Sequence, residues 1–250
     1  ILINEILFNP NVGSSDFLEL YNTSDNVLNL ADFTIANTDN GLINSFENIE
    51  TGYLLFPQTY AVLSPAIQNI KNEYLDETVN DALFLETNLP TFPSNKGGIL
   101  LLYNGSAIDG LEYSADWHHT SITNKQGISL ERIDFDTETQ NKDNWHSAAS
   151  DVGFATPSYT NSQSIDEQSA NMGEVWLTNK TFSPDFDGFE DFLLINYEVE
   201  QNGFSATINI YDANGRWIKR IAKNDILGTS GFYKWDGTTD NGTKARMGIY

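Results

Sequence analysis

Short runs of apolar and β-branched residues recur along this chain, and turn-forming residues separate them. Ile1 to Phe8 is such a run, and it ends at Asn9-Pro10, a turn signal. Phe17 to Tyr21 alternates strictly, with Leu18 and Leu20 on one face, which predicts a half-buried strand whose other face meets solvent. Many short strands joined by polar turns predict an all-β protein.

Two Asn-Gly pairs predict tight hairpins, because this dipeptide accepts the positive φ angles of the turns that match strand twist. Asn104-Gly105 lies between Gly98–Tyr103 and Ala107–Tyr113. Asn214-Gly215 joins Ser205–Tyr211 to the strand-like segment that begins at Trp217. We expect each pair of segments to be antiparallel neighbours.

One stretch predicts a helix. Ser64-Pro65 offers a hydroxyl N-cap followed by proline at the first helical position, and Ile67, Ile70 and Tyr74 then fall near one stripe. Strands are expected before it at Val27–Ala36 and Tyr53–Leu63, the second interrupted at its proline. We therefore expect a short helical insertion, Ser64 to Asn88, in an otherwise β domain.

The length of 250 residues predicts two domains. Residues 160–173 are polar with few apolar positions, which is typical of a connector. We place a first domain at 1–159, a linker at 160–173 and a second domain at 174–250. Because the chain begins with Ile1 and not Met, we expect it to be a piece of a longer precursor, and no apolar run reaches the roughly 18 residues of a membrane span.

The formal charge is −22, from 35 acidic residues against 13 Lys and Arg. Such a surface repels phosphate backbones and anionic lipids, which disfavours nucleic-acid and membrane-surface binding. Cation binding and solubility remain as reasons for the charge. The chain has no cysteine, which excludes disulfides and thiolate metal sites.

One acidic stretch has the spacing of metal ligands. Asp185, Asp187 and Asp191 surround Gly188, which permits a sharp turn, as calcium loops require. We expect these three carboxylates and the backbone carbonyl of Phe189 to bind Ca²⁺. The alternative is an acidic turn that caps the following strand without an ion.

Other candidate residues are weaker. The histidines His118, His119 and His146 are expected in exposed loops, and no nucleophile motif accompanies them. Glu5 and Glu19 lie on predicted neighbouring strands and could form a carboxylate pair, although strand carboxylates are commonly solvated. The five tryptophans are scattered over both domains, which favours packing over a sugar-binding platform. We expect no catalytic residues in this chain.

Motifs in the first domain occur in the order found in lamin-tail domains. They are Ile3-Asn4-Glu5-Ile6, Phe17-Leu18-Glu19-Leu20-Tyr21-Asn22, Leu30 to Ile35, Gly98 to Asn104, Gly127 to Arg132, Asn144-Trp145 and Ala155-Thr156-Pro157. Residues 1–160 thus resemble the bacterial extracellular branch of that family. The resemblance implies an immunoglobulin-like β-sandwich used for interaction, with no shared catalytic residues to carry over.

Two motifs in the second domain, Phe182 to Phe192 and Trp235 to Gly242, resemble the immunoglobulin-like domain of the flagellar hook-capping protein. Similar domains occur near the ends of secreted bacterial proteins. In that family the segment at Gly248 to Tyr250 continues as an edge strand, so the resemblance implies that the last strand is truncated here.

Together these features predict two immunoglobulin-like β-sandwiches in a secreted or cell-surface bacterial protein. We expect a non-catalytic interaction or spacer module, stabilised by calcium, whose partner is a protein or a glycan at the cell surface. Two rival functions stay open: a hydrolase that uses first-domain carboxylates, and a carbohydrate-binding module beside a hydrolase. A concave acidic cluster would favour the first rival, and a coplanar aromatic strip the second.

Overall fold

The computed structural model describes residues 1–50, 52–75, 83–164, 173–185 and 187–250. Strands hold 41% of the residues, and α1 (Ile67–Tyr74) is the only α-helix in these ranges, so the all-β prediction is confirmed. The chain divides into two compact units, Ile1–Ala148 with Val152–Ser164, and Ala149–Asp151 with Ile165–Tyr250.

The first unit contains two main sheets. The six-stranded sheet has the order β12-β11-β1-β2-β7-β8, with bounds β12 Trp145–Ser147, β11 Leu130–Arg132, β1 Leu2–Leu7, β2 Phe17–Tyr21, β7 Tyr60–Ser64 and β8 Leu83–Glu86. The four-stranded sheet has the order β10-β9-β4-β5, with bounds β10 Ser106–Ser114, β9 Lys96–Tyr103, β4 Phe33–Asp39 and β5 Leu42–Asn48. The short pair β3 (Leu28–Asn29) and β6 (Leu54–Leu55) and two 3₁₀ turns, η1 (Leu30–Asp32) and η2 (Ala115–Trp117), lie in the segments that connect the two sheets, and a third 3₁₀ turn, η3 (Lys142–Asn144), joins β11 to β12.

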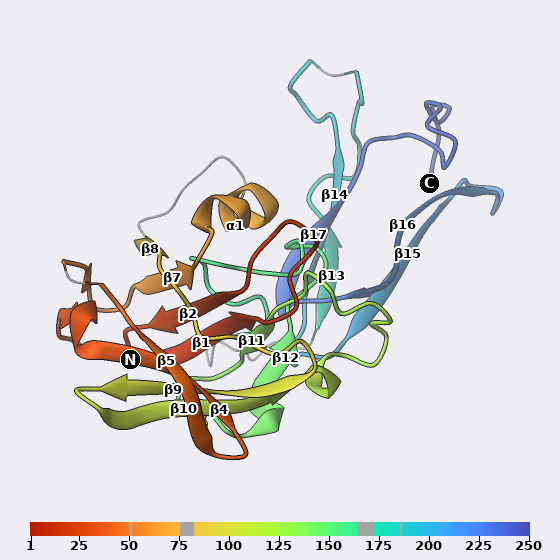
Figure 1. The fold of residues 1–250 in the computed structure, drawn as a ribbon. Helices are drawn as coiled ribbons and strands as arrows, with labels where there is room; N and C mark the ends of the chain where they lie inside the picture. The colour runs from red at the N-terminus through yellow and green to blue at the C-terminus, as the bar shows by residue number, and fades with distance from the viewer. Residues whose placement is uncertain (51, 76–82, 165–172, 186) are drawn as a thin grey trace. The chain divides into compact units, whose positions relative to one another are not determined.

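The main core of this unit lies between the two sheets (Figure 1). Leu18 and Leu20 of β2 face it from the six-stranded sheet, and Ile35 and Leu101 face it from the four-stranded sheet. Alternate residues of each strand therefore fill one interior, as in a β-sandwich.

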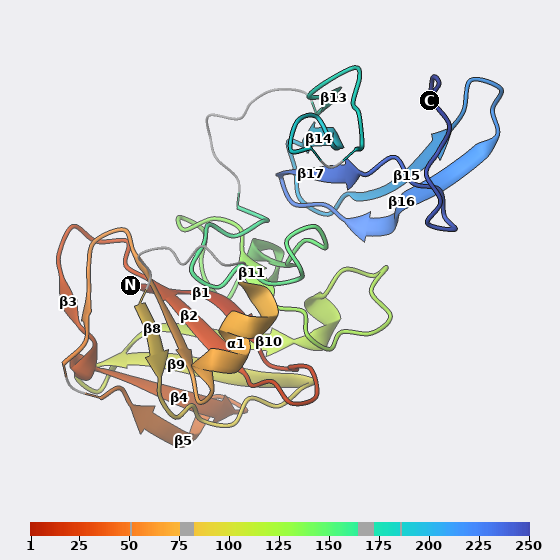
Figure 2. The ribbon, with the colours of Figure 1, turned by 90° about the horizontal axis from the view of Figure 1, so that it is seen from above.

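A second layer covers the outer face of the six-stranded sheet. Phe17 and Val62 point to this side and pack against Ile70 of α1, which lies over the strands in Figures 1 and 2. The prediction that Phe17–Tyr21 has a solvent-facing side is wrong, because Phe17 and Glu19 are fully buried there. The alternation was read correctly, but the covering layer comes from distant segments.

The predicted start of the helix is wrong. Ser64 is not a helix cap: it is the last residue of β7, and its hydroxyl donates to the carbonyl of Asp16 at 2.7 Å. The helix begins three residues later, after Ala66, with no side-chain cap. The helix α1 connects β7 to β8, and these two strands pair in parallel. Residues 76–82 of the predicted insertion lie outside the described residues.

The hairpin at Asn104-Gly105 is confirmed. β9 and β10 pair antiparallel, and both turn residues have positive φ, 47° and 80°, which a two-residue type I′ turn requires. β5 was not predicted; it pairs with β4 through Asn40-Gly41, with φ values of 50° and 77°. The same dipeptide signal was present there.

The second unit also has two sheets. The first has the order β13-β14-β17, with bounds β13 Glu174–Leu177, β14 Leu193–Glu198 and β17 Ser230–Trp235, and the second pairs β15 (Ser205–Tyr211) with β16 (Trp217–Ile226). Tyr197 and Tyr233 from the first sheet and Ala222 from the second form a small core. The predicted antiparallel pairing around Asn214-Gly215 is confirmed for β15 and β16, but the turn is not a two-residue one, because Tyr211 pairs with Trp217 and only Gly215 of the dipeptide has positive φ, 74°.

The predicted connector, residues 160–173, lies partly outside the described residues. Its first residues belong to the first unit, where Asn161 and Gln163 are buried. Among the described residues, no helix is long and apolar enough to cross a bilayer.

Candidate functional site

Three glutamates form a row across the outer face of the six-stranded sheet. Glu131 on β11, Glu5 on β1 and Glu19 on β2 are direct cross-strand partners, so their side chains stand side by side. All three are completely buried. We call this set the glutamate row. The predicted pairing of Glu5 with Glu19 is present, but on a covered face and with a third member.

The segment from Thr156 to Gln163 covers the row and supplies most of its hydrogen bonds. The Thr156 N–H donates to Oε1 of Glu5 at 2.9 Å, and the Ser158 N–H donates to Oε2 of Glu19 at 2.5 Å. Glu131 accepts from the Thr156 hydroxyl at 2.6 Å and, through its other oxygen, from the Gln163 N–H at 3.0 Å. The carboxylates therefore fix a connecting segment that has no strand of its own.

No Lys or Arg side chain is among the hydrogen-bond partners of these carboxylates in the described chain. Burial, then the neighbouring charges of Glu131 and Glu19, raise the pKa of Glu5 well above its usual range. Burial raises the pKa of Glu19 to about 8 and also raises the pKa of Glu131. Three negative charges in a dry site are costly, so the row holds protons at neutral pH.

The contacts of Glu5 show where a proton can lie. Its Oε1 is 2.5 Å from the Ser129 hydroxyl, which also lies 3.3 Å from the carbonyl of Phe154. If Glu5 is protonated and donates to Ser129, that hydroxyl is free to donate to the carbonyl. The second oxygen of Glu5, Oε2, is buried without a hydrogen-bond partner, which suits the carbonyl oxygen of a neutral acid.

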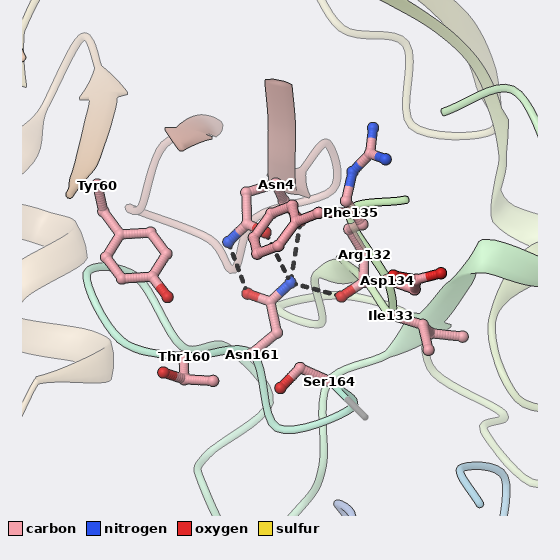
Figure 3. Close-up of a pocket in the computed structure, with 9 residues that line it drawn as sticks. All are labelled: Asn4, Tyr60, Arg132, Ile133, Asp134, Phe135, Thr160, Asn161 and Ser164. Carbon is pink, nitrogen blue, oxygen red and sulfur yellow. Dashed lines mark hydrogen bonds between the residues drawn. The ribbon is translucent and has the colours of Figure 1, made fainter. Parts of the chain in front are cut away.

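A small cavity lies beside the row (Figure 3). Asn4 and Asn161 face each other at its wall: Nδ2 of Asn4 donates to Oδ1 of Asn161 at 2.8 Å, and Asn161 donates to the carbonyl of Arg132 at 2.8 Å. Tyr60 and Phe135 also line it. Its volume of about 40 Å³ accepts water but not a sugar ring or a peptide side chain.

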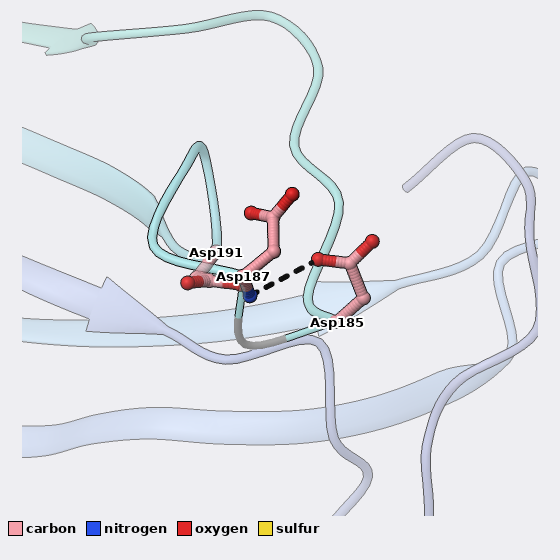
Figure 4. Close-up of side chains that lie close together, drawn as sticks. All are labelled: Asp185, Asp187 and Asp191. Atoms are coloured by element: carbon pink, nitrogen blue, oxygen red, sulfur yellow. Dashed lines mark hydrogen bonds between the residues drawn. The ribbon is translucent and has the colours of Figure 1, made fainter.

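The second carboxylate cluster lies in the second unit (Figure 4). Asp185, Asp187 and Asp191 each offer an oxygen, and these oxygens lie within 4.8 Å of one another. Asp185 and Asp187 are exposed, whereas Asp191 is buried. We call this set the aspartate loop; it is the only group of three such ligands within metal-binding reach in the described chain.

Local backbone bonds shape the aspartate loop. Oδ1 of Asp187 accepts from the Phe189 N–H, and Oδ2 of Asp191 accepts from the Gly188 N–H, each at 2.8 Å. Gly188 has φ of 91°, and Glu190 has φ of 53°, so the chain turns twice through the left-handed region. The predicted carboxylates do converge, and the bonds of the predicted acidic turn are also present.

No family model matches this chain. A search of curated proteins finds no match either.

Other predicted candidates lie apart from both clusters. His118 is buried, contrary to the expectation of an exposed loop, and burial lowers its pKa to about 4. Trp176 and Trp217 expose 44% and 42% of their surfaces, but they lie on different sheets of the second unit. Trp145 and Trp235 are buried in their units.

Sequence reasoning missed Glu131 and the covering segment. Glu131 lies between Leu130 and Arg132, where alternation alone gives no hint of a buried carboxylate. The only available signal was its place on a short strand that could join the sheet beside β1. The donors of Thr156–Gln163 are backbone and hydroxyl groups, which leave no charge pattern in the sequence.

Proposed function

We propose that this chain is a non-catalytic interaction and spacer module of a secreted or cell-surface bacterial protein. The motifs that resemble lamin-tail and hook-capping immunoglobulin-like domains support this proposal, since both families are associated with such roles. The glutamate row supports it too: the carboxylates that a hydrolase would need are buried under Thr156–Gln163 and already bonded to it. The burial of these carboxylates therefore favours a structural role.

The observation that carries the proposal is the exposed edge of the four-stranded sheet. β5 is its outermost strand, and Leu42, Ile43 and Phe46 expose 75%, 51% and 59% of their surfaces. An edge strand offers unpaired backbone N–H and C=O groups to another strand. Apolar side chains beside such an edge provide the pockets that β-strand addition uses for specificity.

Charge indicates the kind of partner. Residues 1–70 contain eight Asp or Glu and no Lys or Arg, and Asp39, Glu47 and Glu50 lie on or beside β5. A second copy of this edge would bring like charges together. The partner that fits is therefore an extended protein segment that alternates apolar residues with Lys or Arg.

A peptide-binding measurement tests this. Fluorescence anisotropy should show that a labelled peptide alternating Val with Lys binds the chain, while its Val-Glu counterpart does not. Phe46→Gln should weaken binding about tenfold, since it removes one apolar contact worth about 1–2 kcal/mol. Val12→Gln is the matched control, because Val12 is also exposed but lies outside β5. Equal loss in both variants, or no binding of the Lys peptide, would contradict the proposal.

The same proposal assigns Ca²⁺ to the aspartate loop, with Asp185, Asp187 and Asp191 as carboxylate ligands and the carbonyl of Phe189 as a further one. Hard oxygen ligands around a tight turn suit this ion. Its role would be to stabilise the second unit, whose core is small.

A further inference from the structure

A cavity of about 480 Å³ lies in the second unit. Leu177, Leu193 and Trp235 line it from β13, β14 and β17, and residues 244–250 line it as well. Cavities that bind ligands in proteins typically measure about 300–1,000 Å³. Unlike the cavity beside the glutamate row, this one can therefore accept side chains of a bound molecule.

Aromatic contacts and a backbone bond shape the cavity. The ring centroid of Trp235 lies 5.3 Å from that of Phe182 and 5.1 Å from that of Tyr250. The N–H of Ala245 donates to the carbonyl of Gly237 at 2.8 Å, which ties the segment around Ala245 to the turn after β17. All five residues line the cavity, so contacts within the unit hold its walls together.

The cavity carries positive charge in an acidic protein. Lys180, Lys244 and Arg246 line it, and no Asp or Glu of the described chain does. All three cations are exposed, and none of them forms an ion pair with a described residue. The chain as a whole has 35 acidic residues against 13 Lys and Arg. Because a cleft lined by one sign of charge concentrates its field, the cavity attracts anions that the rest of the chain repels.

We propose that this cavity binds an extended segment of a partner protein in which one large apolar side chain is flanked by Asp or Glu. Phe182 and Trp235 offer aromatic surface for the apolar side chain, and Lys244 and Arg246 offer partners for the carboxylates. Both β13 and β17 are outer strands of their sheet, so their backbones suit an extended segment. A long polyanion such as a nucleic acid fits less well, because the net charge of −22 repels it.

This site is separate from the β5 edge and selects the opposite charge. A segment that alternates apolar residues with Lys or Arg suits β5, whereas the same segment would meet three cations at the cavity. The two surfaces can therefore be tested independently with peptides of opposite charge.

Fluorescence anisotropy of the full chain with a labelled peptide tests the site. The peptide carries one phenylalanine with two glutamates on each side, and salt of about 0.15 M screens long-range repulsion. We expect binding that Lys244→Gln with Arg246→Gln weakens about tenfold, because two carboxylate partners are lost. Replacing the glutamates of the peptide by lysines should abolish binding, and replacing its phenylalanine by alanine should weaken binding about tenfold.

The matched control removes the same charge elsewhere in the unit. Arg216 and Lys223 are exposed but do not line the cavity, so Arg216→Gln with Lys223→Gln should change the affinity less than about threefold. Equal loss in the two double variants would assign the effect to net charge and overturn the proposal. So would the absence of binding, or equal binding of the lysine peptide.

A measurement on the native chain guards against variants that fail to fold. The indole N–H of Trp235 donates to the carbonyl of Thr238 at 2.9 Å, so its NMR resonance reports on the cavity wall. The glutamate peptide should shift this resonance and leave that of Trp145, which is buried in the first unit, in place. No shift of the Trp235 resonance at saturating peptide would also overturn the proposal.

A second copy of this chain is the competing occupant. Phe189 exposes 70% of its surface beside Asp187 and Glu190, which is the chemistry that the cavity selects. Sedimentation of the native chain without peptide separates the two occupants, and we expect a monomer. Self-association that Lys244→Gln with Arg246→Gln abolishes would make the occupant a second copy and overturn the assignment to a separate partner.

Discussion

The two carboxylate clusters each contain three acidic groups, but these groups lie in opposite environments. The glutamate row is fully buried, and donors from a covering segment contact it, so its members stay protonated or share hydrogen bonds. The aspartate loop leaves two of its three members exposed, so water can solvate their charges. Burial therefore decides whether like charges are neutralised by protons or solvated by water.

This comparison gives the glutamate row the larger energetic role. Glu131 accepts from the hydroxyls of Thr156 and Ser162 and from the Gln163 N–H. Glu131→Ala leaves these donors buried without an acceptor and opens a cavity, so the free energy of unfolding of the first unit should fall by about 3–5 kcal/mol. Hydrogen exchange of β1 and β11 amides in the full chain measures it.

Glu112→Ala is the control for that experiment, since Glu112 is an exposed strand carboxylate of the same unit. Its effect should stay within about 0.5 kcal/mol. Similar exchange rates in the two variants would mean that the row does not hold the covering segment.

The second effect is a dependence of the first unit's stability on pH. A raised carboxyl pKa means that the folded state keeps protons which the unfolded state releases above about pH 4.5. Stability is therefore fully present below that pH and is lost as pH rises through the folded pKa, about 8 for Glu19. We expect the first unit to lose about 2–4 kcal/mol between pH 5 and pH 9, measured by urea unfolding.

Glu5→Gln sharpens this prediction. A glutamine keeps an acceptor at Oε1 for the Thr156 N–H and the Ser129 hydroxyl and cannot ionise; its amide at the buried, unpartnered Oε2 position lowers stability to the same extent at every pH. The loss of stability at alkaline pH should therefore be smaller in Glu5→Gln than in the native chain. Glu19→Gln is the matched contrast, because both Glu19 oxygens accept hydrogen bonds and one would be lost. If the pH dependence of stability is the same in Glu5→Gln as in the native chain, a group other than Glu5 causes it.

The difference between the clusters also explains what the sequence could reveal. The aspartate loop is local: three ligands within seven residues and a glycine at the turn made its convergence predictable. The strands and the Asn104-Gly105 hairpin were predictable for the same reason, since alternation and turn chemistry act between near neighbours.

The glutamate row depends on register and on a distant segment. Glu5 and Glu131 meet only because β1 pairs with β11, and their burial comes from Thr156–Gln163. Likewise, the residues next to Ser64 predict that it caps a helix, but its hydroxyl donates to the backbone carbonyl of Asp16. Pairing between distant segments leaves no pattern among neighbouring residues. The sequence therefore shows the glutamates but does not show that they are buried together.

Calcium should produce a moderate effect confined to the aspartate loop. Extracellular calcium modules bind with Kd of about 10⁻⁴–10⁻³ M, so Ca²⁺ at ten times Kd stabilises a unit by about 1.4 kcal/mol. The thermal midpoint of the second unit should rise by about 5–10 °C relative to chelator. Scanning calorimetry of the full chain measures this, with Glu190→Gln as a control that keeps all three ligands. Equal midpoints with Ca²⁺ and with chelator would leave only the acidic turn.

The smallest predicted effect tests whether Asp187 is a ligand of the ion or only a member of the acidic turn. Asp187→Asn keeps the Oδ1 acceptor for the Phe189 N–H but removes a charge from the cluster, whose oxygens lie within 4.8 Å. In chelator, relief of repulsion should leave the midpoint of the second unit unchanged or raise it by about 2–3 °C. Asp187→Ala loses the hydrogen bond and should lower the midpoint by a similar amount. In Ca²⁺ both variants should lose the ion's stabilisation. If Asp187→Asn still responds to Ca²⁺ like the native chain, Asp187 belongs to the turn and is not a ligand.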